Sequence, residues 1–403
     1  MISYDEAISI IEKYFNEIKL SISEVPLLDS LNFTLAEDIY SDINLPPFDT
    51  SSMDGYGIKY KENIDQWTVI GEISAGNYKD ISIRDNEAVS IMTGSKLPPG
   101  VDSIIQIENV KVNDNHIKLN ENVNIQKGDN VRFCGEDLKK DQLAITKNTL
   151  IKPKNISLAA ACGKKNIQVY APLKIVALSS GDELIPIESV PVNDQIRCSN
   201  IYSLIALIKE INMIPINYGI VKDNKKIMKD ALYSILNDDI DILITTGAVS
   251  VGKYDFLKEM LEDLGSETIF WKVNIKPGKP LLFSIFKKPE KNILIFGLPG
   301  NPASCFVGFH LFIKPFIQKL YHNYKNPEFN AVLKNYIFTQ DRRRQFIRSL
   351  YSFDENKKKY FVEELGMQSS GNMYNLNNAN CLIVLEENLY EKKKGELVKC
   401  IEI

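Results

Sequence analysis

The residues that could do chemistry in this 403-residue sequence gather in four short segments, each following an apolar run. The segments are Ser179–Leu184 (SSGDEL), Val221–Asp223, Gly247–Asp255 (GAVSVGKYD) and Gly297–Ser304 (GLPGNPAS). Glycine lets backbone N–H groups approach a phosphate closely, and the Ser and Thr hydroxyls add further donors. One such loop is weak evidence, whereas four at one edge of a sheet indicate a site for a phosphorylated ligand.

The acidic residues of these segments are Asp182, Glu183, Asp223 and Asp255. Each one alone is typical of a helix N-cap, because a carboxylate just after a strand satisfies the first N–H groups of the next helix. Beside loops that cradle phosphate, the same carboxylates are the hard oxygen ligands that Mg²⁺ prefers. The three histidines lie at no metal-ligand spacing from one another or from cysteine, which also favours a hard cation.

A fifth segment, WKVNIKPGKP, places Lys272, Lys276 and Lys279 close together on a turn stiffened by two prolines. Surface lysines are usually just solvated. Three on one rigid turn, at the same sheet edge as the glycine loops, instead suit a small anion of multiple charge.

The elements that must position these segments alternate between strand and helix from residue 173 to about 320. Apolar strands are predicted at LKIVALSS, IPINYGIV, DILITTG and NILIFGLPG. Helices are predicted at SNIYSLIALIKEI, KKIMKDALYSIL and FLKEMLEDLG, with a long one from Pro302. Such alternation predicts a doubly wound parallel sheet, whose ligands bind at the carboxyl ends of its strands.

The flanking regions have different patterns. Residues 4–19 carry apolar residues at helical spacing, which predicts an amphipathic helix. After the turn-rich loop at 45–57, short alternating apolar runs separated by turn residues continue to about residue 145, and similar runs follow residue 323, which predict two β domains. The fold class expected is therefore α/β plus β, in several domains.

Composition narrows the classes of partner. A formal net charge of −4 offers no general basic excess for nucleic acid. Six cysteines without CxxC spacing fit a reducing cytoplasm and no disulfide framework. The N-terminus does not have the pattern of a signal peptide, and no apolar stretch reaches the length of a membrane span, so we expect a cytoplasmic protein.

In this order, the segments resemble the molybdopterin molybdenumtransferase family, which includes the E domain of gephyrin. The resemblance is carried by PPFDTSSMDGYG, GEISAG, IMTGSKLPPGVDSIIQIE, VRFCGEDL, LSSGDEL, SNIYSL, TTGAVSVGKYDF, FWKVNIKPGKPLLF, GLPGNPAS, RRRQFIR and GMQSSG. It spans more than 300 residues.

The resemblance implies a homodimer of four-domain subunits. Residues 1–45 and 141–170 would form a linking domain, with an inserted β domain at 46–140. Residues 171–322 would form the doubly wound molybdopterin-binding domain, and 323–403 the C-terminal β domain. The implied reaction inserts molybdate into adenylylated molybdopterin with release of AMP, depends on Mg²⁺, and completes the molybdenum cofactor. Molybdopterin adenylyltransferase and apo-molybdoenzymes are the implied protein partners.

The resemblance also assigns roles to individual positions. Catalytic roles fall on Asp54, Thr93, Glu183, Asp223, Asp255, Lys272 and Lys276, of which Glu183, Asp223 and Asp255 would hold the metal. Substrate binding falls on Arg132, Asp137, Ser250, Lys279, Pro299, Pro302, Ser304, Arg344 and Ser370. Asp54, Thr93, Arg132 and Asp137 would be presented by the partner subunit.

The chain departs from the family pattern at Ala248, Asp194 and Cys198, and in the QSSG that contains Ser370. Three alternatives remain beside the molybdate-inserting enzyme. One is a molybdopterin adenylyltransferase, although those are small single-domain proteins. The second is a non-enzymatic scaffold or carrier like gephyrin. The third is a paralogue that inserts tungstate, which has the charge and nearly the size of molybdate.

Overall fold

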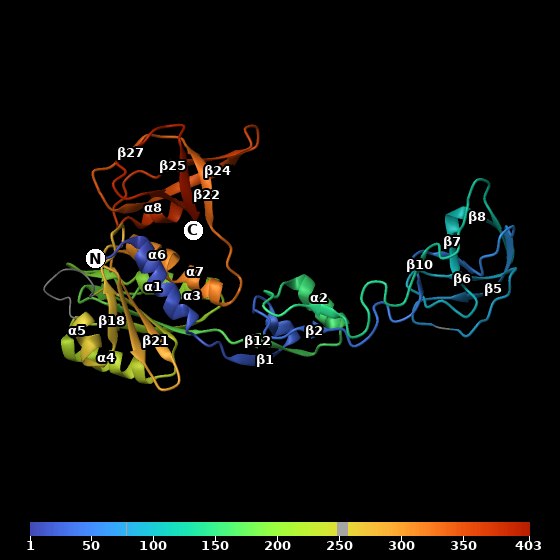
Figure 1. The fold of residues 1–403 in the computed structure, drawn as a ribbon, viewed down its shortest axis with the longest axis horizontal. Helices are drawn as coiled ribbons and strands as arrows, with labels where there is room; N and C mark the ends of the chain where they lie inside the picture. The colour runs from blue at the N-terminus through green and yellow to red at the C-terminus, as the bar shows by residue number, and fades with distance from the viewer. Residues whose placement is uncertain (78, 248–256) are drawn as a thin grey trace. The chain divides into compact units, whose positions relative to one another are not determined.

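The computed structural model describes residues 1–77, 79–247 and 257–403, and divides the chain into two compact units (Figure 1). The first unit comprises Met1–Ser23, Asn32–Thr34 and Tyr170–Ile403. The second comprises Glu24–Leu31 and Leu35–Val169. The finer division into four domains stays a prediction.

The α/β part of the first unit is built on a six-stranded sheet. In spatial order its strands are β16 (Ile214–Val221), β13 (Lys174–Ser180), β17 (Ile242–Thr246), β21 (Asn292–Leu298), β20 (Leu282–Lys287) and β18 (Glu267–Trp271). The first four are parallel, which confirms the predicted fold class. Strands β20 and β18 extend the sheet antiparallel, an edge that the alternating pattern did not reveal.

Helices cover both faces of this sheet (Figure 1). One core contains α1 (Tyr4–Asn16), α3 (Asn200–Glu210), α6 (Pro302–Phe312) and α7 (Lys314–Leu320). The other contains α4 (Lys225–Asn237) and α5 (Leu257–Asp263). In β13, Ile175 and Ala177 belong to the first core, whereas Val176 and Leu178 belong to the second, because successive strand residues point to opposite faces.

Two helices show how local sequence sets the boundaries. The predicted helix at 4–19 is confirmed as α1, which begins where the Ser3 hydroxyl accepts a hydrogen bond from the Glu6 N–H. The long helix predicted from Pro302 is wrong, because the helix breaks at Ile313 into α6 and α7. Pro315 lacks an N–H and crowds the preceding turn, so an uninterrupted helix would lose a hydrogen bond there.

The C-terminal part of the first unit is a small barrel. Its strands are β24 (Arg344–Asp354), β25 (Lys359–Glu364), β22 (Glu328–Leu333), β28 (Leu397–Glu402) and β26 (Cys381–Leu385), and β26 pairs back with β24. Strand β19 (Ile275–Lys276) joins the barrel sheet parallel to β24 and thereby brings the predicted lysine segment to it. Helix α8 (Met373–Asn378) and the pair β23 (Ile337–Phe338) and β27 (Glu391–Lys392) complete this part.

The second unit is built of short strands. Its six-stranded sheet has the order β7 (Ser103–Gln106), β4 (Gly55–Ile58), β6 (Glu87–Ile91), β5 (Gln66–Ile73), β9 (His116–Leu119) and β8 (Val110–Asn113). Two further strand pairs are β3 (Thr50–Ser51) with β10 (Val131–Arg132) and β2 (Ile39–Tyr40) with β11 (Leu143–Ile145). A third pair, β1 (Ile22–Pro26) with β12 (Asn166–Tyr170), reaches the boundary of the unit. The helices are α2 (Pro153–Ala161), η1 (Leu27–Ser30) and η2 (Ile107–Asn109).

Of the helices in the described ranges, none is both long and apolar enough to cross a membrane. All six cysteines are free thiols, and only Cys134 among them is exposed.

Candidate functional site

A pocket of about 640 Å³ lies at the carboxyl ends of the parallel strands. The structure brings all four predicted segments to it, through Ser179–Leu184, Asp223, Gly247 and the run from Pro299 to Pro302. The convergence follows from topology, because parallel strands all end at the same edge of their sheet. Pro299 and Pro302, which were predicted to bind substrate, therefore lie in the pocket wall.

Hydroxyl and amide groups tie the floor of this pocket together. The Ser179 hydroxyl at the end of β13 lies 3.2 Å from the Thr246 hydroxyl at the end of β17. The Asn200 amide, in the first turn of α3, donates to the Gly300 carbonyl oxygen at 2.7 Å. The same amide lies 3.4 Å from the Thr246 hydroxyl, so Asn200 links the ends of β17 and β21, a role that the sequence did not assign. Its position at the start of the helix in SNIYSL was the available signal.

Gly247 shows why the loop after β17 needs glycine. Its φ of +88° lies in the left-handed region, and a Cβ there would come within 2.3 Å of the Ser180 carbonyl oxygen. Gly300 approaches the same backbone, since its own Cβ would lie 3.6 Å from the Gly247 Cα. The absence of side chains therefore lets the two glycine loops pack closely in the wall of the pocket.

The charged form of Asp223 is disfavoured by its surroundings. Burial raises its pKa above the ordinary value, and the nearby carboxylates of Asp182 and Glu183 raise it further. Its Oδ1 atom is buried and has no hydrogen-bond partner among the residues that the structure describes. A bound cation would relieve both conditions. Asp255 and Ser250, the other predicted residues of this edge, lie outside the described residues, as does Ala248.

The lysine segment meets the barrel beside this pocket. Lys276 lines a second cavity, of about 140 Å³, together with Gln345, Gln368 and Arg348 of the barrel. Its ammonium lies 3.5 Å from Asp341 and so keeps one long ion pair. Gly278, in the same turn with φ +97°, lies close to α6, since an added Cβ would be 3.9 Å from the Ser304 carbonyl oxygen. The turn that contains Lys276 therefore lies near the backbone of Ser304.

Arg348 is the residue that sequence reasoning missed. Its side chain is only 1 % exposed, and its Nη2 donates to the Ser369 carbonyl oxygen at 2.8 Å. The next residue, Ser370, accepts a hydrogen bond from Ala303 at the start of α6. Nε and Nη1 of Arg348 have no hydrogen-bond partner in the described part of the chain, and burial lowers its pKa. An unpaired buried guanidinium is costly, so its geometry favours an incoming anion.

Arg344, which the resemblance assigned to substrate binding, already has charged partners in the structure. Its guanidinium is paired with Asp5 at 2.7 Å and Glu386 at 2.5 Å, and lies over the Tyr4 ring. It lines a different pocket, between α1 and the barrel. Because two carboxylates already neutralise it, Arg344 is a poor anion ligand.

The other two predicted lysines lie at the edge of this region. The ammonium of Lys272 lies 3.6 Å from the centre of the Trp271 ring, which holds it by a cation–π interaction. Lys279 is exposed, and its backbone carbonyl accepts hydrogen bonds from Val273 and Leu281 at 3.0 Å each. Lys279 thus fixes the turn through its backbone while its side chain remains in solvent.

The four predicted residues of the second unit form two pairs. Asp54 accepts hydrogen bonds from the backbone N–H of Thr93 at 2.7 Å and from its hydroxyl at 2.9 Å, which lower the pKa of Asp54. Arg132 forms an ion pair with Asp137. The first pair joins residues far apart in the sequence of this unit, whereas the second pair is local.

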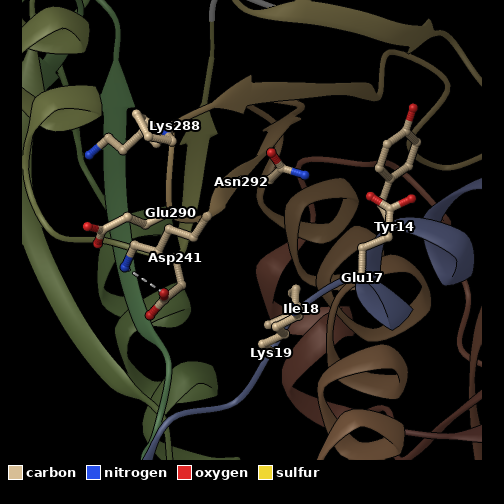
Figure 2. Close-up of a pocket in the computed structure, with 10 residues that line it drawn as sticks. Tyr14, Glu17, Ile18, Lys19, Asp241, Lys288, Glu290 and Asn292 are labelled. Atoms are coloured by element: carbon tan, nitrogen blue, oxygen red, sulfur yellow. Dashed lines mark hydrogen bonds and ion pairs between the residues drawn. The ribbon is translucent and has the colours of Figure 1, made fainter.

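A pocket of about 250 Å³ at the opposite edge of the sheet offers a comparison (Figure 2). Its wall includes Lys291, which is paired with Asp239 at 2.6 Å and Asp241 at 2.9 Å. Lys288 donates to the Asp238 carbonyl oxygen. Lys291 and Lys288 therefore already have oxygen partners, unlike Arg348. No predicted site residue lines this pocket. The candidate anion site therefore lies at the carboxyl edge.

Comparisons with known proteins identify the family. Residues 2–163 match the MoeA N-terminal region (domain I and II), 176–319 a probable molybdopterin binding domain, and 330–403 the MoeA C-terminal region (domain IV). A molybdopterin molybdenumtransferase of Haemophilus influenzae is 34 % identical over 378 residues, which cover 92 % of this chain and 91 % of that protein. Its Bacillus subtilis namesake is 31 % identical, covering 94 % and 89 %.

A solved structure gives the same answer for the fold. The crystal structure of a molybdopterin biosynthesis MoeA protein from Pyrococcus horikoshii OT3 aligns over 100 % of both chains with a TM-score of 0.80 and 27 % identity. Three family regions in order, two long relatives above 30 % identity and one full-length structural match leave a single assignment. The chain belongs to the MoeA family of molybdopterin molybdenumtransferases.

Proposed function

We propose that this protein inserts molybdate into adenylylated molybdopterin and releases AMP, the last step in making the molybdenum cofactor. The single observation that carries the proposal is the buried guanidinium of Arg348 in the cavity that Lys276 also lines, where two of its nitrogen atoms have no hydrogen-bond partner among the described residues. Molybdate is a tetrahedral dianion, so it supplies the charge and the acceptors that this group lacks.

The glycine loops would hold the phosphorylated end of adenylylated molybdopterin. Gly247 and Gly300 line the pocket without side chains that would fill it, and the Ser179 and Thr246 hydroxyls lie at the same strand ends. Asn200 fixes the loop that contains Gly300. Pro299 and Pro302 stiffen this loop, which lowers the entropy lost when the ligand binds.

Molybdate would bind where the lysine turn meets the barrel and α6. We assign Arg348 and Lys276 as its charged ligands, with Lys279, Ser304 and Ser370 around them, and Lys272 beyond. Ser250 would add a hydroxyl. The assignment replaces Arg344 by Arg348, because Arg344 is already neutralised by two carboxylates.

The residues at the acidic end fit a divalent cation. Asp223 offers a buried oxygen that has no hydrogen-bond partner among the described residues, and Asp182 and Glu183 add hard oxygen donors nearby. Carboxylate oxygens are the ligands that Mg²⁺ prefers, and the ion completes its shell with substrate phosphates and water. We propose that Asp223, Glu183 and Asp255 hold it; when bound it would neutralise charge on the phosphates.

The protein's own groups then act by positioning. Lys276 and Arg348 orient molybdate so that the two thiols of molybdopterin replace one oxo group, which leaves as water with the two thiol protons. Hydrolysis of the adenylate phosphoanhydride consumes one water and yields AMP and the molybdopterin phosphate. Neither step requires a covalent bond to the protein, so the described residues need supply only orientation and charge.

We further propose a homodimer in which Asp54, Thr93, Arg132 and Asp137 of one subunit complete the site of the other. The polar pairs that they form within their unit would preorganise this wall. Molybdopterin adenylyltransferase and apo-molybdoenzymes are the proposed partners, and the cytoplasm is the proposed compartment.

The test is transfer to an acceptor. Purified protein, adenylylated molybdopterin, Mg²⁺ and molybdate are incubated, and an apo-molybdoenzyme is added; the proposal expects it to gain activity. Repeating the assay with tungstate in place of molybdate tests whether the protein is instead a tungstate-inserting paralogue. Tight binding of molybdopterin without any activation of the acceptor would support a scaffold instead.

A further inference from the structure

The large pocket has two chemically different ends. The strand-end side is lined by hydroxyls, glycines and acids, such as Ser179, Gly247 and Asp223. The other end is lined by the apolar side chains of Leu184, Ile196 and Met373, which strand pairing and a contact between Met373 and Ser199 bring together. Ile196 is 54 % exposed and Met373 47 % exposed, although both belong to a pocket wall. Exposed apolar groups inside a polar pocket gain free energy when a ligand covers them.

Leu184 and Ile196 form one side of this apolar end. They lie on β14 (Leu184–Ile185) and β15 (Ile196–Arg197), and are register partners in that parallel ribbon. Directly paired residues project to the same face of a sheet, so the two side chains make one continuous apolar surface. A hydrogen bond from the Ile196 N–H to the Glu183 carbonyl oxygen, at 2.8 Å, fixes the ribbon to the predicted SSGDEL loop.

Met373 forms the other side and is held rigidly. It begins α8, whose cap Asn372 accepts a hydrogen bond from the Asn375 N–H at 3.0 Å. The buried Asn375 side chain in turn donates to the Leu365 and Met367 carbonyl oxygens. The sulfur of Met373 lies 3.6 Å from the Ser199 hydroxyl, three residues after Ile196. A thioether is polarizable and contacts aromatic rings favourably.

We propose that Met373 is a ring-binding residue, and that a planar heteroaromatic ring of the substrate lies against it with Leu184 and Ile196 on the ribbon side. The inference rests on the proposed function, which supplies two such rings, the purine of the adenylate and the pterin. The polar end would hold the phosphates while the apolar end selects for the ring.

The experiment compares three probes on the full-length protein: AMP, molybdopterin, and ribose 5-phosphate, which lacks a ring. Met373→Ala is expected to weaken binding of one ring-bearing probe about 3- to 15-fold, from a sulfur–aromatic contact and lost apolar burial. Whichever probe is weakened identifies the ring as purine or pterin. Affinity for ribose 5-phosphate stays unchanged. Met373→Leu, which conserves volume, keeps most of the affinity.

Met367→Ala is the matched control, because Met367 is 80 % exposed in the same loop and does not line the pocket. If Met373→Ala binds both ring-bearing probes as tightly as the unmodified protein, this inference is overturned and the proposed function is not. An equal loss for ribose 5-phosphate would also overturn it, since Met373 would then only shape the pocket. Failure of the unmodified protein to bind any probe would overturn the proposed function with it.

Discussion

Replacing the buried arginine by methionine, Arg348→Met, should separate stability from anion binding. The side chain is 1 % exposed and uses one hydrogen bond, from Nη2 to the Ser369 carbonyl oxygen. Losing that bond costs about 1.5–3 kcal/mol. Burying an unpaired charge costs several kcal/mol, which the substitution removes. The free energy of unfolding of the first unit should therefore stay the same or rise by roughly 1–3 kcal/mol.

Molybdate binding should respond in the opposite direction. Each charge-assisted hydrogen bond from Arg348 to the dianion contributes about 1.5–3 kcal/mol, so its loss should raise the Kd for molybdate roughly 10- to 100-fold. Thermal unfolding with and without molybdate measures both effects, since a bound ligand raises the unfolding temperature. The variant should unfold at the same or a slightly higher temperature than the unmodified protein, and molybdate should no longer shift it.

Arg344→Met is the matched control. Its loss breaks the ion pairs with Asp5 and Glu386 and should lower stability modestly while leaving molybdate binding intact. The reasoning is refuted if Arg348→Met unfolds several degrees earlier and still binds molybdate normally, because Arg348 would then be a structural residue.

Three further perturbations test other parts of the account. Gly247→Ala puts a Cβ 2.3 Å from the Ser180 oxygen at φ +88°, so thermal unfolding should show a loss of about 1–3 kcal/mol together with weaker AMP binding. Asp223→Asn removes a carboxylate whose pKa is raised by burial and by neighbouring acids. The ionised form destabilises the fold above that pKa, so the variant should be at least as stable at pH 7, measured by denaturant titration, yet inactive in acceptor activation. His310 is buried, and its pKa is lowered to about 4 chiefly by desolvation. Because the unfolded chain binds the proton first, stability should fall between about pH 6.5 and pH 4 by on the order of 3 kcal/mol. Denaturant titrations across this range should lose most of that slope in His310→Gln.

The sequence predicted the features that follow from the order of strands and helices. The four loops meet because the carboxyl ends of β13, β16, β17 and β21 lie at one edge, and an alternating strand–helix pattern implies this edge. Helix α1 was likewise recognisable, because its buried positions recur at a helical period.

The sequence could not show which arginine is neutralised, because this depends on pairing between residues far apart in the chain. Arg344 and Arg348 sit four residues apart in β24, and nothing in their local sequence says which one is neutralised. Asp5 comes from the N-terminal helix and Glu386 lies just after β26, so only the tertiary fold assigns both carboxylates to Arg344. The unpaired charge of Arg348 is visible only once its burial is known.

The antiparallel edge of the main sheet was missed for a similar reason. Strands β18 and β20 flank the lysine segment, whose prolines and lysines dominate its sequence pattern. Their pairing is set by contact with β21, a neighbour that local periodicity does not identify.

The measurement that tests the central claim most directly is AMP release from adenylylated molybdopterin, followed with and without molybdate at fixed Mg²⁺. The account predicts release that rises with molybdate and saturates, and that is lost in Asp255→Ala. AMP release at the same rate in the absence of molybdate and tungstate, or none with either anion present, would contradict it, because the chain would not couple anion binding to cleavage of the adenylate.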